Sequence, residues 1–296
     1  MNWSKSLKGK VRFKEPLSRH TSFKIGGSAS LLIEPKDLDD LTNCLSNLKK
    51  DKIPYFIIGN GTNLLINDKG FRGAVIKLDL PYFRNIKIKD NIVSVGAGVS
   101  LPVLLKFLNE EKFIGLEFLA GIPGSVGGAL VMNAGVTINK KRISIGDVVS
   151  KIMVLDKNGK KVLLNKKDAK FKYRGSNLDR YIVLGAQLKL LKDKTKLNNR
   201  VKDYVSHRKD RVDYSKPNAG CVFKNPSLYL SAGALIDRCG LKGKRIGGAM
   251  VSNKHANFIL NFNRATAKDV IQLVKFIKNR VRNKFGINLK EEIRIV

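Results

Sequence analysis

Two glycine-rich segments constrain this chain more than any other feature of its sequence. The first is Gly59-Asn60-Gly61-Thr62-Asn63, and the second is Gly121-Ile122-Pro123-Gly124-Ser125-Val126-Gly127-Gly128, followed by Asn133-Ala134-Gly135. Glycine reaches positive φ at little steric cost, and its backbone N–H groups can approach and hold phosphate oxygens. An apolar, strand-like run at 55–58 leads into the first segment. The two loops together predict a site for a long, phosphate-bearing cofactor.

Neither loop has the spacing of a familiar nucleotide-binding fingerprint. In the first loop, Leu64 stands where the Rossmann pattern has its third glycine, and no Walker lysine follows either loop. Each loop alone is as compatible with a structural turn as with a ligand site. Only the pair favours a ligand.

The charge of the chain suggests a second class of partner, nucleic acids. Its 296 residues include 57 Lys and Arg against 24 Asp and Glu, a formal net charge of +33. Clustered basic residues bind nucleic acids by releasing counterions from the phosphates. Here they are spread along the whole sequence, with no RNP-like strand, helix-turn-helix pattern or aromatic ladder. We therefore expect no specific nucleic-acid partner, and note that a positive field also attracts anionic substrates.

Hydropathy and cysteine content indicate where the protein is located and whether it has disulfides or a metal site. The most apolar stretch, 115–136, contains Glu117, Pro123 and several glycines, so we expect a loop region and no membrane insertion. The first residues lack the apolar core of a secretory signal, which predicts a cytoplasmic protein. Three cysteines without a CxxC pair and three scattered histidines indicate neither a disulfide framework nor a metal site. Cys44 and Cys239 lie in helix-like apolar patterns and are expected to be buried thiols.

The pattern of elements predicts an α+β protein with three domains. Residues 1–80 combine strands near 29–34, 55–58 and 74–78 with a helix at 38–50. Residues 81–194 carry two hairpin signals, Asp90-Asn91 and Asn158-Gly159, besides a helix at 101–111 and a strand at 181–188. Residues 195–285 show helical patterns at 196–209 and 266–284 around a strand at 257–261. The tail, 286–296, alternates like a strand and is expected to return to the first domain.

The order of these motifs closely resembles the bacterial UDP-N-acetylenolpyruvoylglucosamine reductase (MurB) family of peptidoglycan synthesis. The matching segments, besides the two glycine loops, are 20–27 (HTSFKIGG), 173–176 (YRGS), 220–226 (GCVFKNP), 245–248 (RIGG) and 292–294 (EIR). The resemblance implies an FAD-binding module of the vanillyl-alcohol-oxidase (PCMH) type in two subdomains, 1–80 and 81–194. A C-terminal α+β substrate domain would occupy 195–285.

The resemblance also implies the cofactors. FAD would be bound without a covalent link, since neither glycine loop contains His or Cys, and NADPH would be the co-substrate. The implied FAD-binding residues are Gly59, Asn60, Gly61, Thr62, Asn63, Gly121, Ile122, Pro123, Gly124, Ser125, Gly128, Asn133, Ala134 and Gly135.

The implied reaction has two halves: NADPH gives hydride to the flavin, and the reduced flavin gives hydride to the enolpyruvyl double bond of the UDP-sugar, yielding UDP-N-acetylmuramate. Arg174 matches the family's active-site arginine, which would stabilise charge growing at the substrate carboxylate. Glu292 matches the family's glutamate, selected over Glu291 by its Glu-x-Arg spacing. Cys221 stands where many members have the serine that delivers the proton. Since a thiol, with a reference pKa of about 8.5, is a stronger acid than an alkanol, the chemistry survives this departure.

Substrate-binding candidates follow from the same resemblance. Arg174 and Cys221 are 47 positions apart, which resembles the class lacking the insertion that carries a substrate-clamping tyrosine. The candidates are Tyr173, Arg208, Arg211, Lys224 and Asn225, and a monomer is favoured. Two alternatives stay open: another flavin oxidoreductase of the same fold with a different substrate, and a non-catalytic, basic nucleic-acid-binding protein.

Overall fold

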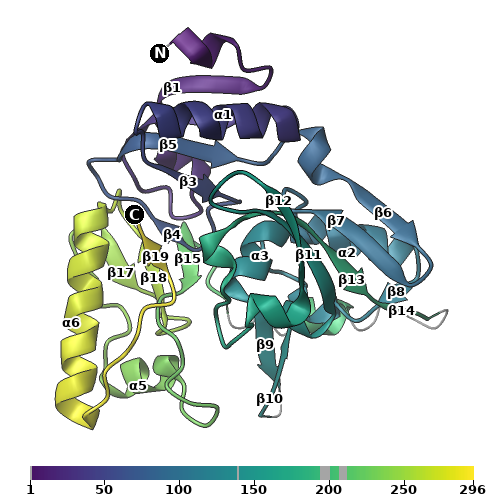
Figure 1. Cartoon of the computed structure of the whole chain (residues 1–296). Coiled ribbons are helices and arrows are strands. Elements are labelled where there is room, and N and C mark those ends of the chain that lie inside the picture. Colours follow the sequence, from purple (N-terminus) through teal and green to yellow (C-terminus); the bar gives the residue numbers. More distant parts are fainter. Residues whose placement is uncertain (1, 139, 194–200, 207–211) are drawn as a thin grey trace. The chain divides into compact units, whose positions relative to one another are not determined.

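The chain divides into two compact units. The structure, a computed structural model, describes residues 2–138, 140–193, 201–206 and 212–296. The first unit comprises Met1–Phe13, Ser30–Asn60 and Gly73–Ser206, and the second comprises Lys14–Ala29, Gly61–Arg72 and His207–Val296. Figure 1 shows the elements of both. The three-domain division expected from the sequence, with two flavin subdomains at 1–80 and 81–194, stays a prediction.

The N-terminal sheet has four strands in the order β1-β2-β5-β3. Their bounds are Lys10–Pro16, Ser28–Glu34, Phe71–Lys77 and Tyr55–Ile58, with β3 and β5 parallel. Helix α1, Leu38–Lys50, begins where the Asp37 side chain accepts a hydrogen bond from Asp40 N, and it buries Leu41, Cys44 and Leu48. Strand β1 was not predicted, because its charged sequence KVRFKEP leaves it an exposed edge strand without a clear apolar face.

The second sheet of the first unit has the order β12-β11-β13-β7-β6. The bounds are Ile86–Lys89 for β6, Ile92–Gly96 for β7, Val149–Leu155 for β11, Lys161–Asn165 for β12 and Ile182–Lys189 for β13. Strands β6 and β7 pair antiparallel, as do β11 and β12, so both predicted hairpins are confirmed. Helix α2, Leu101–Glu110, is capped by the Ser100 side chain.

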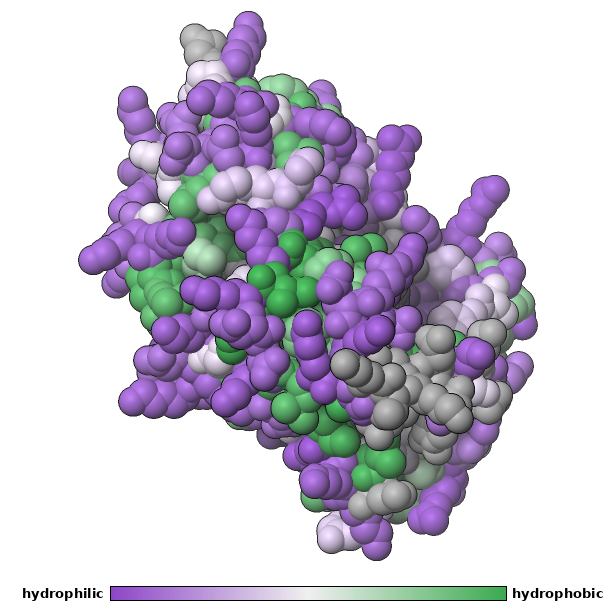
Figure 2. All heavy atoms as spheres, turned by 90° about the vertical axis from the view of Figure 1, so that its right-hand side faces the viewer, coloured by the Kyte–Doolittle hydropathy of each residue, from purple (hydrophilic) through white to green (hydrophobic). Residues whose placement is uncertain are grey.

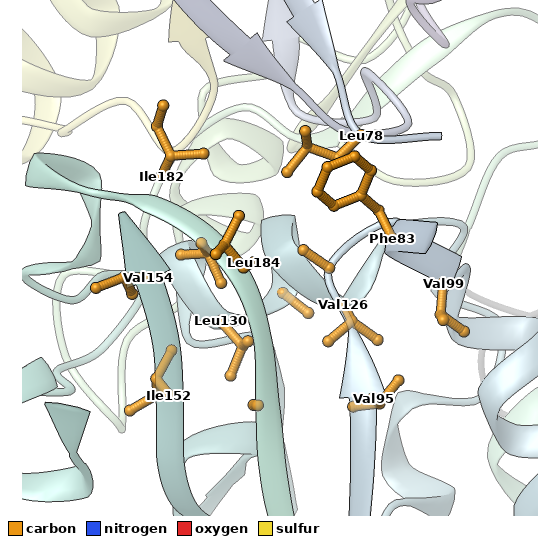
Figure 3. Packing of buried hydrophobic residues seen from close by; sticks show 14 of the residues in the cluster. Leu78, Phe83, Val95, Val99, Val126, Leu130, Ile152, Val154, Ile182 and Leu184 are labelled. Carbon is orange, nitrogen blue, oxygen red and sulfur yellow. The ribbon is translucent and has the colours of Figure 1, made fainter. Parts of the chain in front are cut away.

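The region 115–136 was expected to be a loop, and this expectation is wrong. It contains η4, Glu117–Leu119, and a helix, α3, at Val126–Met132. Ser125 Oγ accepts a hydrogen bond from Gly128 N and so starts the helix. Because Gly127 has no side chain, the first turn lies close to the end of β7; a Cβ there would be 3.0 Å from Ala97 Cβ. Figure 3 shows Val126 and Leu130 of α3 packed in the core with side chains of β7, β11 and β13.

A short hairpin follows α3. Strands β9, Gly135–Ile138, and β10, Lys141–Ser144, pair antiparallel, with Gly135 opposite Ser144 and Thr137 opposite Arg142. This hairpin was not predicted, since its sequence is basic and lacks a recognised turn signal. The shorter elements of this unit are β8 at Phe113–Ile114, β14 at Leu191–Lys192, and η1 at Asn2–Lys5, η3 at Pro81–Arg84, η5 at Ile145–Asp147, η6 at Lys166–Ala169 and η7 at Leu178–Arg180.

The second unit is built on an antiparallel sheet with the order β15-β18-β17-β16. The bounds are Asn218–Cys221 for β15, Arg245–Ile246 for β16, Ala249–Val251 for β17 and Phe258–Asn261 for β18, with helices α5 at Ala232–Arg238 and α6 at Ala267–Phe285, and η2 at Leu17–His20. Helix α6 starts in a capping box of Thr266 and Asp269 and ends at Gly286, whose φ is 68°. Its buried face joins the core of this unit.

The C-terminal tail is less regular than predicted. Only β19, Arg294–Ile295, is a strand, and it pairs in parallel with β4, Leu64–Leu65. Upstream, a single bridge joins Glu291 to Phe223. The alternation that predicted a strand over 286–296 overran these short pairings, because it also reflects Leu289 and Ile293 packing into the core. The predicted helix at 196–209 is helical at 201–206; its other residues lie outside the described ones.

Within the described residues, no helix combines the length and apolar character needed to cross a membrane.

Candidate active site

The two glycine loops meet in the first unit. A Cβ at Gly59 would collide with Ser125 Oγ, and Asn60 Nδ2 donates a hydrogen bond of 2.9 Å to Pro123 O. Glycine at position 59 is therefore required by the close approach of the second loop. The structure thus brings together two segments that are more than sixty residues apart in the sequence.

Backbone hydrogen bonds hold the second loop to the start of α2 and the end of β7. Gly124 O accepts from Leu101 N at 2.9 Å, and Val126 N donates to Val99 O at 2.8 Å. Gly121 has a φ of 76°, which glycine tolerates best. Ile122 is half-buried against the core, whereas Gly121, Pro123 and Gly128 are exposed.

The exposed part of the second loop fits a phosphate-bearing cofactor. Around Gly128, the nearest atom to an added Cβ would be Ser125 Oγ at 3.4 Å, so the backbone there is accessible. Exposed glycine backbone in a fixed loop is the kind of surface that holds a pyrophosphate.

The rest of the first segment continues into the second unit. Gly61 has a φ of 63°, and a Cβ there would collide with His20 O. Thr62 is half-buried. Asn63 Nδ2 donates to Glu292 O at 3.0 Å, and Asn63 O accepts from Arg294 N at 2.9 Å. Asn63, expected to contact the cofactor, therefore also fixes the backbone of the predicted catalytic glutamate.

The segment Asn133-Ala134-Gly135 holds a neighbouring turn. Asn133, in the left-handed conformation after α3, donates from Nδ2 to Lys172 O at 3.1 Å and accepts at Oδ1 from Gly146 N at 3.0 Å. Ala134 N donates to Ala129 O at 2.8 Å. The Asn133 side chain therefore binds protein backbone at both ends of its amide.

Tyr173 and Arg174 form the tip of that turn. Lys172 and Gly175 exchange backbone hydrogen bonds of 2.9 and 3.2 Å, and Arg174 has a φ of 53°. A non-glycine residue at positive φ is strained, and such strain is typical of functional sites. Arg174 Nη1 donates to Gly135 O at 2.8 Å. The turn therefore presents the predicted catalytic arginine in one fixed geometry.

A second arginine, which the sequence did not single out, lies beside this turn. The Arg142 guanidinium carbon is 3.9 Å from the centre of the Tyr173 ring, and that of Arg174 is 5.6 Å from it. Arg142 belongs to the unpredicted hairpin, so no signal in the sequence pointed to it.

Cys221 ends β15 at an irregular point of the sheet. The register shifts between Asn218 and Cys221, and Gly220, with a φ of 76°, has open space around it. Cys221 lies opposite Phe258 of β18 and is half-buried. The bulge bends the strand at the position of Cys221, the predicted proton donor.

The residues after Cys221 are held by Asn257, a residue that is 3% exposed. Asn257 Oδ1 accepts from Phe223 N at 2.9 Å, and Nδ2 donates to Phe223 O at 2.8 Å. Asn257 O accepts from Val222 N at 2.8 Å. This buried clamp, which sequence reasoning missed, fixes the chain directly after Cys221.

The backbone of Glu292 lies against the same segment. Glu292 N donates to Val222 O at 2.7 Å, so the residue next to Cys221 pairs with the predicted catalytic glutamate. Glu291 Oε1 accepts from Lys278 Nζ at 2.7 Å. Burial would raise the pKa of Glu291, but the hydrogen bond and charge of Lys278 lower it. Glu291 is therefore an ionised partner of α6, and its neighbour Glu292 lies on the segment paired to 222–223.

The other predicted residues are placed as follows. Lys224 is half-buried, and its N–H donates to Lys290 O at 2.8 Å. Asn225 Oδ1 accepts from Ala232 N at 3.1 Å, at the start of α5. Arg208 and Arg211 lie outside the described residues. Arg174 belongs to the first unit, and Cys221 and Glu292 belong to the second.

The cysteines form no disulfide. Cys44 is fully buried in α1, as predicted; burial, followed by the charge of Asp40, raises its pKa to about 12. Cys239 was expected to be buried but is only half-buried, because it lies at the end of α5. No group of three or more His, Cys, Asp or Glu among the described residues is arranged to hold a metal ion.

Comparison with known proteins identifies the family. Residues 29–165 match the model of an FAD binding domain, and residues 211–296 match the C-terminal domain of UDP-N-acetylenolpyruvoylglucosamine reductase. The reductase of Caldanaerobacter subterraneus subsp. tengcongensis is 42% identical over 97% of this chain and 94% of its own, and that of Desulforamulus reducens is 40% identical over 98% and 95%. The crystal structure of the reductase MurB from Thermus caldophilus has a TM-score of 0.81 at 34% identity, covering 98% of this chain and 99% of that one. The chain therefore belongs to the UDP-N-acetylenolpyruvoylglucosamine reductase family and has its α+β fold with an FAD-binding domain.

Proposed function

We propose that this chain reduces UDP-N-acetylglucosamine enolpyruvate to UDP-N-acetylmuramate with FAD and NADPH, in peptidoglycan precursor synthesis. The observation that carries the proposal is the pairing of Glu292 N with Val222 O, which fixes a carboxylate-bearing residue beside the segment of Cys221. That pairing lies in the region matched by the reductase C-terminal domain.

FAD, when bound, supplies the hydride-transfer chemistry that no amino-acid side chain offers. The joined glycine loops, with exposed backbone at Gly121 and Gly128, would hold its pyrophosphate. The remaining predicted contacts, from Asn60 to Asn63 and from Asn133 to Gly135, belong to the same proposal.

Arg174 would bind the substrate carboxylate. Hydride addition at the terminal carbon of the enolpyruvyl group leaves negative charge beside that carboxylate, and a fixed guanidinium stabilises this charge as it grows. The turn at 172–175 and the hydrogen bond to Gly135 O already hold Arg174, so little reorganisation accompanies the reaction. Glu292 would polarise or protonate the same end of the substrate.

Cys221 would then deliver the proton. A thiol is a stronger acid than the serine hydroxyl found at this position in many relatives, and it can protonate a carbanion at least as readily. Asn257 and the bulge at Gly220 give the residue a defined place.

The test separates the two half-reactions under anaerobic conditions. Cys221→Ala should leave reduction of the bound flavin by NADPH nearly unchanged, and should slow its reoxidation by the enolpyruvyl substrate by about 100- to 10,000-fold. Cys221→Ser, which keeps a proton donor, is the matched control and should recover most of the rate. Equal slowing of both half-reactions would exclude the assignment.

Arg174→Ala and Glu292→Gln should slow the same half-reaction. Recovery of the flavin absorbance with this substrate, measured for the unmodified protein, also decides against a flavin enzyme of the same fold with another substrate.

Partners and location complete the proposal. Lys224, Asn225, Arg208 and Arg211 would contact the UDP-sugar, and the enzyme would be a cytoplasmic monomer without a specific nucleic-acid partner. On the face drawn in Figure 2, hydrophilic residues are spread between apolar areas and form no single stripe. Sedimentation would test the monomer, and a salt titration of RNA binding would test the basic-protein alternative.

A further inference from the structure

Arg142, on β10, lies beside the turn that carries Arg174. It is exposed, and no ion pair within the described part of the chain involves it. Its guanidinium carbon is nevertheless held 3.9 Å from the centre of the Tyr173 ring. That contact places the guanidinium over the face of the ring.

The same ring also lies near the guanidinium of Arg174. Its carbon is 5.6 Å from the ring centre, so both guanidiniums are within the range of about 6 Å of a cation–π contact. Both arginines are fixed to one hairpin: Arg174 through Gly135 O at the start of β9, and Arg142 through its place on β10 opposite Thr137. Two cations are thus arranged around one aromatic side chain by two independent anchors.

The local charge is strongly positive. Lys141 and Lys172, next to Arg142 and Tyr173 in the sequence, are both exposed. Like charges at short range repel one another, and a bound anion of two or more charges relieves that repulsion. A planar guanidinium donates two parallel hydrogen bonds to a carboxylate or a phosphate. Of these groups, a diphosphate or a phosphate monoester carries two charges, so it best matches the cluster around Arg142.

We propose that Arg142 binds a phosphate of the nucleotide substrate, on the Tyr173 ring beside Arg174. The inference rests on the proposed function, because it takes Arg174 as the residue that binds the reacting carboxylate. Two substrates carry the required chemistry: the UDP-sugar through its diphosphate, and the dinucleotide NADPH through its phosphates. Arg142 would supply binding energy to the phosphate and would not take part in proton or hydride transfer.

The first experiment measures binding without turnover. UDP and NADP⁺ are titrated separately into the FAD-loaded protein by calorimetry, using the unmodified protein, Arg142→Ala and Arg142→Lys. Arg142→Ala should weaken binding of one of these ligands about 10- to 100-fold, as expected for loss of a charge-assisted hydrogen-bond pair, and Arg142→Lys should fall between. Weaker UDP binding identifies the UDP-sugar as the ligand, and weaker NADP⁺ binding identifies the dinucleotide. Unchanged binding of both ligands overturns the proposal.

Arg180→Ala is the matched control. Arg180 is exposed and ends η7 in the same unit, and no cation–π contact in the described part of the chain joins it to Tyr173. Its replacement by alanine removes the same charge as Arg142→Ala. This variant should bind both ligands like the unmodified protein; weakening equal to that of Arg142→Ala would mean a general charge effect and would overturn a specific site.

The Tyr173 ring provides a second variant pair. Tyr173→Phe keeps the aromatic face and should retain the Arg142 contribution to binding, whereas Tyr173→Leu should reduce it. In half-reaction kinetics, Arg142→Ala should raise the KM of the affected substrate and leave the limiting rate within about threefold, the pattern of uniform binding. A fall in the limiting rate with unchanged KM would contradict the role.

Failure of the proposed function gives a different result. If the protein binds UDP through Arg142 but its reduced flavin is not reoxidised by the enolpyruvyl sugar, the reductase activity is wrong and the phosphate site stands. If reoxidation proceeds and Arg142→Ala binds both ligands normally, the activity stands and the phosphate site is wrong.

Discussion

Replacement of Asn257 tests how the second unit holds the segment of Cys221. Asn257→Ala removes two hydrogen bonds, to Phe223 N and to Phe223 O, and Phe223 is itself 1% exposed. Water cannot reach the backbone groups left behind, so each costs about 1 to 3 kcal/mol. We therefore expect the free energy of unfolding to fall by about 2 to 6 kcal/mol. Urea denaturation followed by circular dichroism measures this change as a shift of the midpoint.

Asn261→Ala is the control: Asn257 directly precedes β18, and Asn261 is its last residue. Asn261 also binds two backbone groups, donating to Phe23 O at 3.0 Å and accepting from Ala265 N at 2.8 Å, but it is only half-buried. Water can replace these bonds, so the loss should be about 1 kcal/mol. Asn257→Asp should be at least as damaging as Asn257→Ala, because a carboxylate oxygen would face Phe223 O. If Asn257→Ala is no less stable than Asn261→Ala, the buried clamp does not fix this segment.

Three further predictions follow from particular contacts. Alkylation of the folded protein near pH 8 should modify Cys221 well before Cys44, whose burial raises its pKa to about 12; mass spectrometry of the peptides decides the order. Gly59→Ala forces a Cβ into Ser125 Oγ, so FAD affinity measured by flavin fluorescence should fall at least tenfold, whereas Gly159→Ala, in open space but at positive φ, should leave it unchanged. Burial would raise the pKa of Asp213, but hydrogen bonds from Ser215 and Ser252 outweigh this effect and lower the pKa. The ionised Asp213 therefore stabilises the fold at any pH above the unfolded pKa of about 4. This stabilisation is lost as the pH falls through the lowered pKa of the folded protein. Asp213→Asn should flatten that acid limb in urea titrations, and an unaltered limb would assign the acid sensitivity to other groups.

Local signals account for what the sequence predicted correctly. Asp90-Asn91 and Asn158-Gly159 mark tight turns, and both hairpins are present. Helix α6 was predicted within one residue at each end, because Thr266 and Gly286 are strong start and stop residues.

The errors came from contacts between distant segments. Helix α3 contains two glycines, which disfavour a helix locally, yet packing of Gly127 against Ala97 favours it. Likewise, Asn257 contacts Phe223 34 residues away, and Arg142 reaches Tyr173 from an unpredicted hairpin. No local pattern reports such pairs, so the resemblance found Arg174, Cys221 and Glu292 but not the residues that hold or surround them.

The second unit has a consequence for the order of folding. It is assembled from three stretches of chain, 14–29, 61–72 and 207–296, and its hydrogen bonds join residues as distant as Phe23 and Asn261, 238 positions apart. Contacts of such high sequence separation form slowly, because long loops must close first. During synthesis, the segments 14–29 and 61–72 leave the ribosome long before residues 207–296, with which they pack. Until then they lack these contacts. The region around Cys221 can therefore reach its final arrangement only after translation has passed Glu292, which makes its assembly one of the last steps in the maturation of the enzyme.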